Sequence, residues 1–122
     1  MYELVFSKTI EEDIDLCYSY IRDNLEAPMA AENLMKELYE RLNYIKEKPY
    51  SRPFVHDEFL SSLGIRSIKV KNYLVFYYVE DNESKKTVNL VSFMYNKRDW
   101  INILKEIEIK SIPYTVELYE KL

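Results

Sequence analysis

The fold of this chain is decided by residues 64–79, which read GIRSIKVKNYLVFYYV. Ile68 and Val70 alternate with polar residues, and this period of two predicts a strand with one buried and one exposed face. The pair Lys71-Asn72 predicts the turn that follows. Tyr73–Val79 is apolar throughout and rich in β-branched and aromatic residues, which indicates a central strand. Residues 64–79 therefore predict two strands joined as a hairpin.

A third strand and a helix are predicted to follow this hairpin. The polar run Asp81–Ser84 predicts a turn, and Thr87–Tyr95 predicts the next strand. Residues 95–100 read YNKRDW and place basic side chains just before a helix, where cations are unfavourable for the helix dipole. The helix is indicated by apolar residues at helical spacing, which predict packing against the sheet or against other helices: Trp100, Ile103, Leu104 and Ile107.

Upstream of the hairpin, the sequence predicts one strand and two helices. Tyr2–Phe6 is a short strand candidate, and Thr9 with Glu12 has the spacing of a capping box at a helix start. Pro28 suits the first residue of a second helix, which ends before Lys48-Pro49 because proline cannot continue it. Each helix has one apolar stripe: Ile10, Ile14, Cys17, Tyr18, Ile21 and Leu25 on the first, and Ala31, Leu34, Met35, Leu38, Leu42 and Ile45 on the second.

These elements predict an α+β fold in the order β-α-α-β-β-β-α, with a helical hairpin packed on a twisted antiparallel sheet. Helices on one face would leave the other face, or a groove at the sheet edge, free for a partner. The connector between residues 50 and 63 is predicted to be irregular, with a helical turn at Asp57–Leu60. Residues 1–110 form one predicted domain, and residues 111–122 a tail that is a mobile end, a packing element or a dimer contact.

Composition excludes several classes of protein. One glycine among 122 residues excludes glycine-rich phosphate loops of the P-loop or dinucleotide type. Cys17 is the single cysteine and His56 the single histidine, so neither an internal disulfide nor a histidine-based metal cluster can form, and no cofactor is expected. The longest apolar run has seven residues and no signal peptide is apparent, which predicts a cytoplasmic protein without a membrane span.

Charge is unevenly distributed along the chain. The net charge is −4, but residues 1–60 carry a net charge of −6 and residues 61–105 a net charge of +4. A nucleic-acid enzyme gains from a broadly positive face, so the overall acidity weighs against RNA as a substrate. Twelve tyrosines suit either the core or a protein interface, because aromatic residues are enriched at interface centres.

Several short segments, in their order and spacing, resemble the RelE/ParE superfamily of bacterial toxins. They are Phe6-Ser7, Pro28 with Ala30-Ala31, Lys48-Pro49, Gly64-Ile65-Arg66, Asn72–Tyr77 and Tyr95–Trp100. The resemblance extends over roughly residues 1–107. It implies the toxin of a type II toxin–antitoxin module, a protein that inhibits growth or stabilises a plasmid. It also implies a cognate antitoxin, whose C-terminal segment would add a helix to an apolar groove or a strand to a sheet edge.

The resemblance leaves two kinds of toxin open. RelE-like members cut mRNA in the ribosome, which requires help for the attacking 2′-hydroxyl, positive charge on the phosphate and a proton for the leaving oxygen. ParE-like members inhibit DNA gyrase without a known hydrolytic site. Lys69 and Lys71 lie where RelE-like enzymes carry strand lysines, and Arg98 matches the arginine after the last strand. Leu74 and Leu104, however, stand where a strand arginine and a late tyrosine or histidine would act.

This incomplete catalytic set favours a ParE-like inhibitor of a protein such as DNA gyrase. The alternative is a RelE-like endoribonuclease that acts on mRNA at the ribosome, with Lys69, Lys71 and Arg98 as its catalytic residues. A third hypothesis is a non-toxic interaction module that kept the fold. A homodimer is compatible with the tyrosine content and the tail.

Three further residues are predicted to contact the target or the antitoxin: Arg66, Lys97 and Tyr95. For Arg66 the competing interpretation is an ion pair with a helix carboxylate. His56, beside Asp57 and Glu58, is either a base or an ordinary loop residue.

Overall fold

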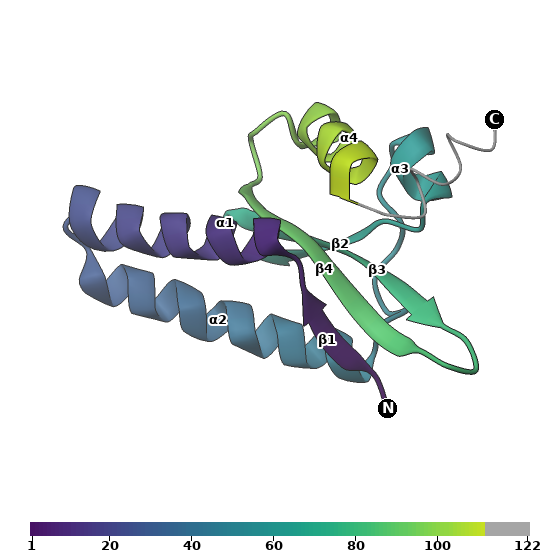
Figure 1. Ribbon diagram of the computed structural model, residues 1–122. Coiled ribbons are helices and arrows are strands. Elements are labelled where there is room, and N and C mark those ends of the chain that lie inside the picture. The colour runs from purple at the N-terminus through teal and green to yellow at the C-terminus, as the bar shows by residue number, and fades with distance from the viewer. Residues whose placement is uncertain (112–122) are drawn as a thin grey trace.

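The computed structural model describes residues 1–111, with side chains described as far as residue 107 (Figure 1). The elements are β1 (Glu3–Phe6), α1 (Lys8–Ser19), the π-helical turn η1 (Tyr20–Asn24), α2 (Pro28–Glu47), α3 (Glu58–Ser62), β2 (Arg66–Val70), β3 (Tyr73–Asp81), β4 (Lys86–Tyr95) and α4 (Trp100–Ser111). The predicted α+β order is confirmed, and α3 lies where a helical turn was predicted. Residues 112–122, nearly all of the predicted tail, lie outside the described residues.

The four strands form one mixed sheet in the order β1-β4-β3-β2. The β2–β3 and β3–β4 pairs are antiparallel, as predicted. β1 pairs in parallel with β4, so the prediction of a wholly antiparallel sheet is wrong for this strand. The alternation of residues in a strand fixes its faces but not its partner, and here Glu3 pairs with the distant Thr87.

α1 and α2 form the predicted helical hairpin and lie side by side on one face of the sheet (Figure 1). Ser7 rather than Thr9 caps α1, because Ser7 follows β1 in extended geometry and its hydroxyl accepts a hydrogen bond of 3.0 Å from the Ile10 N–H. The predicted capping box is therefore wrong by two residues. α2 begins at Pro28 and ends at Glu47, as predicted.

Two hydrophobic cores lie on opposite faces of the sheet. The first joins the helical hairpin to the sheet and includes Ile10, Ile14, Leu34, Leu38, Leu42, Ile45, Val75, Tyr77 and Leu90. The second lies under α3 and α4 and includes Leu60, Ile65, Phe76, Val91, Met94 and Leu104. Trp100 packs on Phe76 with 5.1 Å between ring centroids. Of the two predicted alternatives, an open second face is therefore wrong, and among the described residues the uncovered part of the sheet is at its edge.

β4 carries a bulge where α1 meets the sheet. Tyr77 pairs with Leu90 and Phe76 pairs with Ser92, so Val91 has no counterpart on β3. The bulge lies directly beyond the end of the β1–β4 pairing, which stops at Leu90.

Side chains from the start of α1 satisfy the polar groups of this bulge. The Ser7 hydroxyl donates to the Val91 carbonyl at 2.9 Å. The Asp13 carboxylate accepts two hydrogen bonds through one oxygen, from the Ser92 hydroxyl at 2.8 Å and from the Phe93 N–H at 3.0 Å. These bonds fix α1 on β4 and with it the entire helical hairpin.

Candidate functional site

Two basic turns meet at one end of the sheet. The backbone N–H of Asn96, after β4, donates to the carbonyl of Asn72, in the β2–β3 turn, at 2.8 Å. Four of the six predicted site residues lie in or beside these turns, and all four are exposed: Lys71, Tyr95, Lys97 and Arg98. In residues 1–107 none of the three cations makes an ion pair. This end of the sheet therefore presents unneutralised positive charge beside an exposed phenol.

An aromatic cluster supports this basic end. Tyr73 stacks on Phe93 with 5.0 Å between ring centroids and contacts the edge of Tyr95 at 5.7 Å. Burial, followed by hydrogen bonding with Cys17, raises the pKa of Tyr73, and burial likewise raises the pKa of the Cys17 thiol. Both groups therefore keep their protons at neutral pH, which suits a supporting role rather than acid–base chemistry.

Lys69 lies apart from this end, on the outer strand β2. It is exposed, pairs with Leu74 of β3, and lines a groove of about 280 Å³ between α2 and the sheet edge. The other lining residues are Ile68, Arg41, Tyr44 and Arg52. Sequence reasoning missed Arg41 and Arg52, because no spacing in the sequence links a helix residue and a loop residue to a strand that follows them.

Arg66 lies at the opposite end of β2 from Lys71 and is held by aromatic rings. Its guanidinium carbon is 4.2 Å from the ring centroid of Phe54 and 5.3 Å from that of Tyr50. Its Nη1 donates to the carbonyl of Arg52. Within residues 1–107 it makes no ion pair, so the ion-pair interpretation is wrong: the aromatic loop before α3, and not a helix, folds over the start of β2.

The two positions that the resemblance assigns to further catalytic groups, Leu74 and Leu104, are apolar and belong to the second core. Leu104 is 0% exposed, and Leu74 is half-buried against the same core. His56 is exposed and makes no hydrogen bond within the described residues. Its neighbour Asp57 instead caps α3, accepting from the Leu60 N–H at 3.0 Å, and lies 3.4 Å from the Lys105 ammonium.

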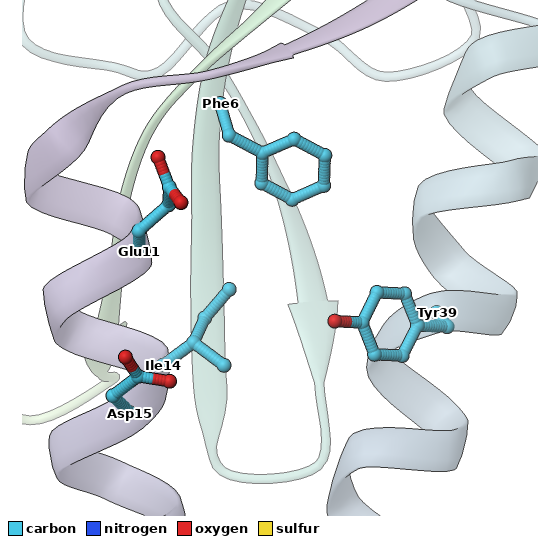
Figure 2. Close-up of a pocket in the computed structure, with 5 residues that line it drawn as sticks. All are labelled: Phe6, Glu11, Ile14, Asp15 and Tyr39. Atoms are coloured by element: carbon cyan, nitrogen blue, oxygen red, sulfur yellow. The ribbon is translucent and has the colours of Figure 1, made fainter.

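A second groove lies between α1 and α2, at the end of β1. Figure 2 shows the Phe6 and Ile14 side chains between the two helices, Glu11 and Asp15 along α1, and the Tyr39 hydroxyl directed toward α1 from α2. Its volume is about 430 Å³. The sequence held a signal for part of this lining, since Tyr39 follows Met35 of the apolar stripe by four residues and so lies on the same side of α2.

Two structural features are absent from the described residues: a cluster that could hold a metal ion and a helix that could span a membrane. Among residues 1–111, no three histidine, cysteine, aspartate or glutamate side chains lie close enough together to hold a metal ion. In the same part of the chain, no helix has the length and apolar character needed to cross a bilayer.

Comparison with known proteins identifies the family. A sequence profile described as "ParE toxin of type II toxin-antitoxin system, parDE" matches residues 4–100. Comparison with curated protein sequences gave no match. Among solved structures, the chain is similar to one described as a chromosomal ParDE TA system from P. aeruginosa, with a TM-score of 0.62 and 14% identity over 78% of this chain and 96% of that one.

A second similar structure is described as a YoeB/ParE toxin from Agrobacterium tumefaciens, with a TM-score of 0.55 and 12% identity over 78% of this chain and 98% of that one. At these identities the structural likenesses establish the fold alone. The profile match covers most of the sequence, including both basic turns and the helical hairpin of α1 and α2. The chain therefore belongs to the ParE toxin family of type II toxin–antitoxin systems.

Proposed function

We propose that this chain is a cytoplasmic ParE-like toxin that stops growth by binding an essential protein such as DNA gyrase, and that a cognate antitoxin neutralises it. The observation that carries this proposal is the burial of Leu104 in the second core, against which Leu74 also packs. A ribonuclease of the RelE kind would need a cation and a proton donor at these positions. Apolar side chains inside a core supply neither.

Inhibition by binding requires different features of the protein surface. It requires an exposed surface with an aromatic anchor and charges that orient the partner, and no acid–base pair. The basic end of the sheet has both features: Tyr95 is 40% exposed, and Lys97 and Arg98 follow it closely in the sequence. We therefore assign contact with the target to Tyr95, Lys97 and Arg98.

The second candidate is a RelE-like endoribonuclease, and one observation favours it. Lys71, Lys97 and Arg98 gather at one end of the sheet without ion-pair partners in residues 1–107, as a site for an RNA phosphate would require. The two candidate functions differ in which of these side chains is essential. Phosphate binding depends on the charges, whereas protein binding depends equally on the Tyr95 ring.

The test combines two assays. The protein is induced in bacterial cells, several translated messages are examined by primer extension within minutes, and purified protein is added to a gyrase supercoiling reaction. We expect growth arrest, intact messages and inhibited supercoiling. Position-specific cuts that disappear when translation is blocked would establish the ribonuclease instead. Continued growth with folded protein in the lysate would indicate a non-toxic interaction module and contradict both kinds of toxin.

Matched substitutions sharpen this test. Tyr95→Ala and Arg98→Ala should both weaken a gyrase inhibitor, whereas a ribonuclease should lose activity in Arg98→Ala and largely keep it in Tyr95→Ala. Lys85→Ala is the control, because Lys85 is an exposed cation in the β3–β4 turn, at the other end of the sheet. Circular dichroism should show that all three variants are folded.

A further inference from the structure

The groove beside β2 brings together cations from three separate segments. Arg41 comes from α2, Arg52 from the loop before α3, and Lys69 from β2 itself. The Tyr44 ring completes the wall. Within residues 1–107, none of the three cations makes a side-chain hydrogen bond or an ion pair. The chain has 21 acidic residues and a net charge of −4, yet no described carboxylate lines this groove.

Arg41 differs from an ordinary surface cation. Glu37 precedes it by four residues on α2, which is a favourable spacing and order for an ion pair on a helix. Within residues 1–107 no such pair forms, and Arg41 instead lines the groove while only partly exposed. A partly buried guanidinium without a counter-ion is unfavourable, so a bound anion explains its position better than helix stability does.

The positive charge extends around the groove. Burial raises the pKa of the Tyr77 phenol to about 12, and the charges of Arg66 and Arg52 act in the opposite direction. Nη1 of Arg66 donates to the carbonyl of Arg52, which links the loop to the start of β2. The Lys48 ammonium lies 5.9 Å from the ring centroid of Tyr44. The lining cations therefore belong to a wider basic region.

The amount of charge indicates the chemistry of the ligand. A carboxylate supplies one negative charge, whereas a phosphate group supplies about 1.5 to 2 at neutral pH and three acceptor oxygens. The planar guanidinium of arginine pairs well with either group, because it donates two parallel hydrogen bonds. Two phosphate groups therefore match the charge of the three lining cations, for which separate carboxylates would have to be three.

The size of the groove favours a small ligand over a polymer. Its volume of about 280 Å³ lies near the lower limit of pockets that bind small molecules. Along α2 the groove gives way to carboxylates, since Glu37 lies one turn before Arg41 and Glu40 one turn before Tyr44. A nucleic acid that continued past the groove in this direction would bring its phosphates close to these like charges.

We propose that the groove beside β2 binds a small anion with two or more phosphate groups, either free or carried by a nucleotide. Its phosphate oxygens accept hydrogen bonds from Arg41, Arg52 and Lys69, and the ligand thereby joins α2, the loop before α3 and β2. In a nucleotide, the base lies against the exposed Tyr44 ring. This site lies apart from the basic end of the sheet, so the inference does not depend on the target of the toxin.

The test is an NMR titration of isotope-labelled full-length protein with pyrophosphate, tripolyphosphate and ADP, at constant pH and ionic strength. We expect saturable shifts of the side-chain N–H signals of Arg41 and Arg52 and of the Lys69 amide, at millimolar ligand or below. Potassium chloride at the same ionic strength should cause none of these shifts. Absence of saturable shifts with all three phosphate ligands would overturn the proposal.

Two comparisons identify the source of the phosphate groups. If the site recognises phosphate alone, ADP and pyrophosphate bind equally well and Tyr44→Ala changes neither. If it recognises a nucleotide, ADP binds more tightly and loses this advantage in Tyr44→Ala. Both results support the proposal. Single-stranded oligothymidine that displaces pyrophosphate from the same residues at a lower phosphate concentration would overturn it in favour of a nucleic-acid surface.

Neutral substitutions locate the site. Arg41→Gln and Lys69→Gln should each weaken pyrophosphate binding by about tenfold, because each removes a charged hydrogen-bond donor. Lys36→Gln is the control, since Lys36 is an exposed cation on α2 that does not line the groove. All three variants lose one positive charge. Equal losses in all three would therefore show attraction to the overall charge alone and would overturn the proposal.

Discussion

Replacing Asp13 should loosen the whole helical hairpin from the sheet. Its carboxylate is the sole side-chain acceptor in residues 1–107 for the Ser92 hydroxyl and the Phe93 N–H at the β4 bulge. In Asp13→Ala both donors lose that acceptor. Ser92 is 1% exposed, so its hydroxyl cannot turn to solvent without opening the contact between α1 and β4.

The size of the effect follows from these two bonds. A hydrogen bond to a charged group contributes about 1.5–3 kcal/mol. Asp13 is only half-buried, so water recovers part of the loss, and we expect Asp13→Ala to lower the free energy of unfolding by about 3 kcal/mol. A domain of this size is stable by roughly 5–15 kcal/mol, so the melting temperature should fall by about 10 °C. Asp13→Asn keeps an acceptor without the charge and should lose about half as much.

Urea unfolding followed by the fluorescence of Trp100, the single tryptophan, measures this change. Asp15→Ala is the matched control, because Asp15 lies on the same helix, is exposed and makes no hydrogen bond or ion pair in residues 1–107. It should change stability by less than about 0.5 kcal/mol. Any gain in helix propensity is common to both substitutions and cancels. If Asp13→Ala were no less stable than Asp15→Ala, the bulge would not depend on this carboxylate and the reasoning would fail.

Three further predictions concern single side chains. Lys71 has a φ of 53°, so Lys71→Gly should stabilise the protein by about 0.5–1 kcal/mol in thermal unfolding; a stabilised variant that no longer stops growth would show that the lysine side chain contacts the target. Burial raises the pKa of Cys17, so its thiol should react with a disulfide reagent about tenfold more slowly than free cysteine at pH 8 and speed up as the pH rises; reaction at the free rate would contradict this. The hydrogen bond from the Leu60 N–H, followed by Lys105, lowers the pKa of Asp57, so this cap stabilises α3 above the ordinary aspartate pKa and is lost as the pH falls through the lowered value. The protection factor of the Leu60 amide, the ratio of its intrinsic to its observed exchange rate at the same pH, should therefore fall in acid in the native chain, and no such fall should remain in Asp57→Asn.

Local patterns in the sequence predicted most of the helices and strands. They could not predict which strands pair when those strands lie far apart in the sequence. Proline positions fixed the ends of α2, and the alternation at Ile68 and Val70 fixed β2, because both effects act on neighbouring residues. The direction of β1 depends on a partner far along the chain, and no local preference encodes it. Asp13 lies between Ile10 and Ile14 of the buried stripe, and this position could have indicated that it contacts the sheet. It also belongs to a run of acidic residues, which favoured the prediction of a solvated helix face instead.

For the candidate site as well, local segments could be predicted from the sequence and contacts between distant segments could not. The two basic turns could be predicted because residues 95–100 and the hairpin turn carry their charges in short, continuous segments. The groove beside β2 could not, since Arg41, Arg52 and Lys69 meet only after α2, the loop and β2 have packed together. The aromatic contacts of Arg66 were missed for the same reason.

The position of β4 between β1 and β3 has a consequence for how this toxin is made. β1 leaves the ribosome first, but its partner is the last strand to be synthesised. Until β4 emerges, β1 has no neighbour, α1 has no bulge to bind, and the apolar stripe of the helical hairpin has only part of its cover. Long-range pairing of this kind delays folding until late in synthesis. A chain that ends before β4 should therefore be degraded by proteases and should not be toxic.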